Sequence, residues 1–89
     1  MSMEVVHDRK ASRFSVTIEG ATAHVEYREP DADTVDFLHT FTPPELRGRG
    51  VARVIVDAAL EWARGEGKRI IPTCWYVRKV LEGPDTRET

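Results

Sequence analysis

Residues 43–64 read PPELRGRGVARVIVDAALEWAR, and this stretch leads from a glycine-containing turn directly into a strongly helical segment. From residue 51 onward, apolar residues recur every three or four positions, which places them along one face of a helix. They are Val51, Val54, Ile55, Ala58 and Trp62, widened by Ala52, Val56, Ala59 and Ala63. Arg53, Asp57, Glu61 and Arg64 occupy the other face. We therefore expect an amphipathic helix that lies flat on a sheet and ends at Gly65 or Gly67.

Strand-like segments flank this helix on both sides. Short runs of alternating apolar residues, separated by turn residues, are typical of half-buried strands. We expect strands over 5–7, 13–19, 22–28, 34–42 and 70–73, and a short final helix over 75–82. Gly20-Ala21 is predicted to connect a tight hairpin, and 29–33 to form a polar turn. Alternation in the fourth strand predicts one shared face for Val35, Phe37, His39 and Phe41.

The order of these elements predicts an α/β fold class, with a mixed α+β sheet in the order β-β-β-β-α-β-α. Short turns between the first four strands favour antiparallel pairing. The helix between the fourth and fifth strands favours a parallel, right-handed crossover. A chain of 89 residues suits a single domain over 1–89, in which 84–89 is expected to be a flexible tail.

Composition narrows the functional classes. The net charge is −2, which gives no overall attraction to nucleic acid or to an anionic membrane. The sequence lacks the ~20 consecutive apolar residues of a membrane helix, and a single cysteine fits a reducing compartment, so we expect a cytoplasmic protein. Cys74 and the three histidines lack metal-ligand spacing, which predicts no metal site. His7 and His24 are expected at the surface.

The helix begins with Arg47-Gly48-Arg49-Gly50, where a Ser or Asp cap would be usual. A helix N-terminus offers unpaired N–H groups and a partial positive charge, and glycines let a phosphate approach the backbone closely. The two arginines can add charge-assisted hydrogen bonds. The pattern favours a pyrophosphate-binding loop. The alternatives are a helix start without a ligand and an RNA-contacting Arg-Gly segment.

These residues resemble the GNAT superfamily of N-acetyltransferases. PPELRGRGVA is similar to the acetyl-CoA signature of that family, with Arg47, Gly50 and Ala52 at its three fixed positions. The preceding HT, the helix end LEWARGEG and the later IPTCWYV resemble the compact, single-domain YjdJ-type branch. The resemblance covers roughly 14–80. It implies a GNAT-like fold, acetyl-CoA as co-substrate and an amine as acetyl acceptor.

The resemblance also implies which residues bind the co-substrate. Backbone amides of 48–52 would hold the pyrophosphate, and main-chain groups of 40–42 would run beside the pantetheine arm. The fourth and fifth strands would splay apart, and the thioester would lie in that gap. The implied cofactor-binding residues are Thr40, Phe41, Thr42, Arg47, Gly48, Arg49, Gly50, Val51 and Ala52.

His39 and Cys74 are the catalytic candidates, because the compact branch carries His and Cys at these positions. His39 suits proton acceptance, and Cys74 would carry the acetyl group or lie beside the thioester. Phe41 departs from the acid usual at its position, so His39 or a water chain must replace that acid. Packing roles stay open for His39 and for Cys74 as an inert thiol. Tyr76 either packs or protonates the departing thiolate.

The function predicted is acetyl transfer from acetyl-CoA to an amine. The alternative is an acyl-CoA-binding module or sensor with little or no catalysis, and a third reading is a structural protein without a cofactor. Only 8–12 separates the first two strands, which predicts an open acceptor side.

Overall fold

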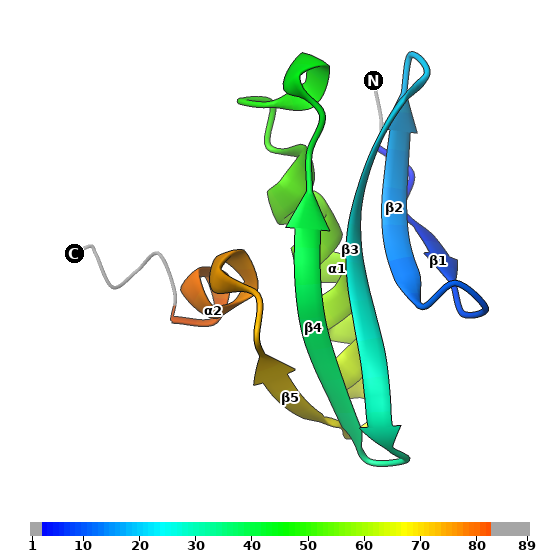
Figure 1. Cartoon of the computed structure of the whole chain (residues 1–89), viewed down its shortest axis with the longest axis vertical. Helices are drawn as coiled ribbons and strands as arrows, with labels where there is room; N and C mark the ends of the chain where they lie inside the picture. Colours follow the sequence, from blue (N-terminus) through cyan, green and yellow to red (C-terminus); the bar gives the residue numbers. More distant parts are fainter. Residues whose placement is uncertain (1–2, 83–89) are drawn as a thin grey trace.

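The computed structural model describes residues 3–82, which form a five-stranded sheet and two α-helices (Figure 1). The strands lie side by side in chain order; the first four pair antiparallel, and the fifth pairs parallel with the fourth. This confirms the predicted fold class and element order. The predicted tail over 84–89 lies outside the described residues. The elements are β1 (Val6–Asp8), β2 (Arg13–Ile18), β3 (Ala21–Asp31), β4 (Thr34–Phe41), a 3-10 helix (Pro44–Leu46), α1 (Val51–Gly65), β5 (Arg69–Pro72) and α2 (Trp75–Glu82).

Helix α1 lies across one face of the sheet, here named the helix face (Figure 1). No helix within residues 3–82 lies over the opposite face of β2, β3 and β4, here named the open face. The core is formed by alternating side chains of these strands and by α1. Its strand members are Phe14, Val16, Ile18, Ala23, Val25, Tyr27, Val35 and Phe37.

The stripe that α1 buries is rotated from the predicted one. Leu60 is buried, whereas Val54 is 36% exposed. The apolar stripe in the sequence is wider than the contact, so the sheet selects the line through Val51, Ile55 and Ala59 and leaves Val54 at the margin. The predicted charged face is confirmed as exposed.

The β2–β3 hairpin turns one residue earlier than predicted. Glu19 and Gly20 both have positive φ (53° and 84°), and Ile18 pairs directly with Ala21. Two consecutive left-handed residues match the twist of a two-residue hairpin. Strand β3 also continues through Asp31, so the predicted polar turn over 29–33 shortens to 32–33.

Strand β1 completes an aromatic cluster on the helix face. His7 stacks on Phe14 with ring centroids 3.9 Å apart, and its Nε2 shares a 2.6 Å hydrogen bond with the Tyr27 hydroxyl. The Trp62 ring meets His7 edge-on at 4.8 Å. The prediction that His7 lies at the surface is therefore wrong: it is half-buried, and this burial, reinforced by Arg9, lowers its pKa.

Strand β4 carries a bulge at Leu38. Tyr27 of β3 pairs with Phe37, but the preceding Glu26 pairs with His39, so Leu38 is an extra residue in β4. An extra residue bends the strand and breaks the alternation of its side chains. Residues before and after Leu38 therefore follow different alternations.

The bulge corrects the predicted face of β4. Val35 and Phe37 are buried against α1, as expected. Beyond Leu38, Thr40 takes the helix face, while His39 and Phe41 take the open face with their β3 partners. The prediction of a single face was wrong because it assumed an unbroken ladder.

Strands β4 and β5 separate after Phe37 and Pro72, their last paired residues. Pro72 has no N–H to donate, which favours the end of pairing here. The Cys74 amide donates a 2.8 Å hydrogen bond to the Phe37 carbonyl, and α2 then begins. The β4 edge over 38–41 consequently has no strand partner in the described part of the chain, which confirms the predicted splay. No described helix has the length and hydropathy needed to span a membrane.

Candidate functional site

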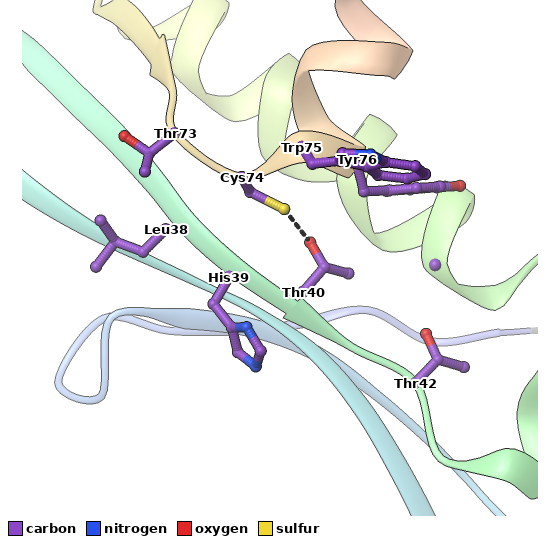
Figure 2. Close-up of a pocket in the computed structure, with 9 residues that line it drawn as sticks. Leu38, His39, Thr40, Thr42, Thr73, Cys74, Trp75 and Tyr76 are labelled. Carbon is purple, nitrogen blue, oxygen red and sulfur yellow. Dashed lines mark hydrogen bonds between the residues drawn. The ribbon is translucent and has the colours of Figure 1, made fainter.

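A groove runs along this unpaired edge of β4. Its larger part, of about 500 Å³, lies between β4 and the start of α2 (Figure 2). A smaller part, of about 230 Å³, lies at the start of α1. The two parts share Thr42, Ala52 and Tyr76, so they form one continuous groove from the glycine turn to Cys74.

The glycine turn forms one end of the groove. Gly48 and Gly50 both have φ of +77°, and a Cβ added to either would meet no other atom within 4 Å. The left-handed backbone therefore favours glycine at both positions, and the space next to each Cα is open. Gly50 caps α1 without a side-chain hydrogen bond, and the first intrahelical bond is donated by Val54 N. The amides of Gly50, Val51 and Ala52 therefore precede the intrahelical ladder at the positive end of the helix dipole.

Arginines surround this end of the groove. The Nε of Arg47 donates a 3.0 Å hydrogen bond to the Thr42 carbonyl, which ties the turn to the end of β4. Arg49 reaches the Glu45 carbonyl at 3.5 Å, and Arg53 pairs with Asp57 on the exposed face of α1. Arg47 and Arg53 line the smaller part of the groove, which gives it a positive mouth.

Two aromatic rings form the wall opposite β4. Trp75 and Tyr76 stack with centroids 6.2 Å apart and an interplanar angle of 18° (Figure 2). Trp75 is 66% exposed, although it is a large apolar residue. Burial raises the pKa of the Tyr76 phenol, so this hydroxyl stays protonated at neutral pH and can donate a hydrogen bond.

Cys74 lies at the far end of the groove. Its Sγ is 3.2 Å from the Thr40 hydroxyl, and the bulge brings this pair together by turning Thr40 to the same side (Figure 2). Thr40 was expected to contribute only main-chain groups to the site, and no role was predicted for its side chain. Its contact with Cys74 depends on the bulge, for which the sequence carries no local signal.

His39 and Cys74 both line the groove, but their side chains do not meet. Figure 2 shows the His39 ring turned away from Cys74. On the open face its ring lies 6.1 Å from that of His24, whose Nε2 is 3.6 Å from a Glu26 carboxylate oxygen. Burial and the nearby Arg13 lower the pKa of His24, although Glu26 opposes them. Half-buried His24 was predicted only as a surface residue.

Three features of this site bear on a bound phosphorylated carrier. The amides at the start of α1 can hold phosphate oxygens, and the unpaired β4 edge can pair with an extended amide-containing chain. The far end offers a thiol, a hydroxyl and an imidazole. Among the residues that the structure describes, no group of three His, Cys, Asp or Glu side chains could hold a metal ion.

Comparison with known proteins gives consistent matches. The family model described as GCN5-related N-acetyl-transferase matches residues 13–87. Protein NATD1 of Xenopus tropicalis is 40% identical over 86 residues, covering 93% of this chain and 79% of that protein. The human NATD1 protein is 36% identical over 85 residues, covering 92% and 75%. The solution structure of a GCN5-like protein from Staphylococcus aureus is 28% identical, with a TM-score of 0.71 over 93% of this chain and 81% of that one.

Proposed function

Because the chain belongs to the GCN5-related N-acetyltransferase family, we propose that it transfers an acetyl group from acetyl-CoA to an amine. The observation that carries the proposal is the continuous groove, which joins bare helix amides at one end to Cys74 and His39 at the other. An elongated carrier with phosphates at one end and a thioester at the other matches this arrangement. A short apolar ligand would make no hydrogen bonds with the bare amides of the glycine turn.

The binding residues divide along the groove. Amides of 48–52, with the Arg47 and Arg49 guanidinium groups, would hold the pyrophosphate. The pantetheine arm would add to the unpaired edge of β4 beside Thr40, Phe41 and Thr42, much as an extended peptide adds to a sheet edge. The Trp75–Tyr76 stack would cover the arm from the opposite side.

Acetyl transfer requires one proton acceptor and one proton donor. The amine nitrogen bonds to the acetyl carbonyl carbon, the carbon–sulfur bond breaks, and coenzyme A leaves as a thiolate. We assign acceptance of the amine proton to His39 on the open face, directly or through water. We assign donation to the leaving thiolate to Tyr76, because its phenol belongs to the wall of the groove and carries an O–H. Fixed positioning of the two reactants supplies much of the rate.

Cys74 offers a second route to the same product. Its sulfur could take the acetyl group from the thioester, releasing coenzyme A, and then pass it to the amine. Thr40, at 3.2 Å, would hold the sulfur in position. Mass spectrometry after incubation with acetyl-CoA distinguishes the routes. Full activity of Cys74→Ser, with no acetyl adduct on the wild-type cysteine, would eliminate the covalent route.

A binding module without catalysis is the second candidate. It is favoured by Phe41, which stands where similar sequences have an acid, and by the His39 ring, which points away from Cys74 (Figure 2). Such a protein would hold acetyl-CoA in the same groove and release no product faster than solvent hydrolysis.

Binding and turnover are tested separately. The chain has two tryptophans, so Trp62→Phe leaves Trp75 as the only one, at the wall of the groove. We expect acetyl-CoA to change its fluorescence, while the matched Trp75→Phe protein, which reports from Trp62, stays silent. Release of free thiol with a panel of amines then measures turnover. Binding with turnover supports the transferase, binding alone supports the module, and neither would refute both.

A further inference from the structure

Exposed apolar side chains gather around the larger part of the groove. Leu38 and Trp75 line it and are 38% and 66% exposed. Ile71 and Phe41, 38% and 40% exposed, belong to the open face on either side of Leu38. Ile71 pairs with Asp36 of β4, and Phe41 pairs with His24 of β3. Large apolar groups exposed together mark a surface that meets another molecule.

The same part of the groove offers little to a positive charge. Its described lining residues include no carboxylate. Two acids of the open face on β3 and β4 already have partners: Asp36 accepts a 2.6 Å hydrogen bond from the Thr73 hydroxyl and pairs with Arg28, and Glu26 pairs with Arg13. An ammonium group placed here would lose its hydration without gaining a counter-ion, which is costly.

We infer that the acetyl acceptor is an apolar primary amine with a single basic group, rather than a polyamine. This rests on the proposed acetyltransferase function. A monoamine that gives up its proton becomes uncharged, and its alkyl or aryl remainder then gains from contact with Leu38 and Trp75. A diamine or polyamine keeps at least one ammonium group, for which the exposed apolar residues around the groove (here named the rim: Leu38, Phe41, Ile71 and Trp75) provide no counter-ion.

Hexylamine and 1,5-diaminopentane form a matched test pair, because they have equal chain length and differ by one terminal methyl against one ammonium. With the wild-type protein and acetyl-CoA, we expect kcat/KM to be at least tenfold higher for hexylamine. Equal values, or a preference for the diamine, would overturn the inference. Calorimetric binding of each amine to the coenzyme A-loaded protein tests the preference without turnover. A hexylamine preference in binding, with no acetylation, would reject the transferase and leave the rim's selectivity intact.

Introducing a negative charge beside the larger part of the groove gives the second test. Leu38 is already partly exposed, so Leu38→Glu adds a carboxylate beside the groove, and we expect the preference to shift at least tenfold towards the diamine. Val6→Glu is the matched control, because Val6 is 53% exposed and lies on β1 at the opposite edge of the sheet. Unchanged acetyl-CoA binding verifies that the site of Leu38→Glu is intact. An unshifted preference in that intact protein contradicts the inference.

Discussion

Gly50→Ala separates the backbone role of the glycine turn from its proposed binding role. The residue caps α1 at φ +77°, and its added Cβ would meet no protein atom within 4 Å. The cost to folding is therefore the left-handed backbone alone, about 1–2 kcal/mol for an L-residue. Gly20, at φ +84° and equally open, lies in the β2–β3 hairpin far along the chain from the groove. Gly20→Ala should thus lose about 1–2 kcal/mol as well.

The two variants should differ in binding. The Cβ at position 50 points into the open space where the phosphates are proposed to lie, and it would displace hydrogen bonds to a charged group. Each such bond contributes roughly 1.5–3 kcal/mol, so Kd for acetyl-CoA should rise about 10- to 150-fold. Gly20→Ala should bind like the wild type. Urea denaturation measures the stabilities and calorimetric titration the affinities.

Two results would refute this reasoning. If Gly50→Ala is folded and binds acetyl-CoA with unchanged affinity, the amides at the start of α1 do not hold the phosphates. If Gly20→Ala loses affinity equally, the loss follows from weakened folding, and the expected difference between the two glycines is wrong.

Further predictions concern stability and the two faces of β4. Burial lowers the pKa of His7 in the folded protein, so the unfolded chain binds protons more readily and stability should fall as the pH drops below 6.5. Thermal melts of the wild type and of His7→Phe over this pH range measure the fall in stability. An equal pH slope in both proteins would count against a contribution from His7. Phe37→Ala empties a fully buried position and should cost about 3–5 kcal/mol in urea denaturation; a loss below 1 kcal/mol would contradict the core as described. Deleting Leu38 removes the extra residue but keeps the pairs Glu26–His39 and Val25–Thr40, so His39 should stay on the open face and the melting temperature should change little; a collapse of the melt would mean that the bulge itself stabilises the sheet.

Structural features that depend on residues close together in the chain were predictable from the sequence. The amphipathic run of α1 and the alternation of β2 and β3 are local, and they sufficed for the element order and the antiparallel-then-parallel pairing. The glycine turn was also recognisable, because a helix start without a polar cap is unusual in itself. The approximate path of the groove, including the break between β4 and β5, was implied by the resemblance to the GNAT superfamily and not by a local pattern.

Features that depend on register between distant segments were not predictable. Nothing near Leu38 marks it as an extra residue, because the bulge exists only relative to Glu26 and Tyr27 on β3. The face of His39 and the meeting of Thr40 with Cys74 follow from that register. The rotation of α1, which buries Leu60 and exposes Val54, likewise depends on the surface against which the helix packs.

The bulge also explains how one strand can serve two reactants. Without it, the side chains of His39 and Phe37 would share a face, and the proposed proton acceptor would lie buried under α1. With it, Thr40 meets Cys74 beside the groove, while His39 opens onto the uncovered face with Leu38. In the proposed reaction the thioester carrier would therefore lie along the groove, the amine would enter from the open face, and the two would meet at the unpaired edge of β4 beside Leu38. That separation assigns the proton donor to the groove wall, at Tyr76, and the acceptor to the open face, at His39. Tyr76→Phe keeps the ring that lines the groove and removes only the hydroxyl, so Tyr76→Phe and His39→Gln should each impair one proton transfer and leave acetyl-CoA binding intact.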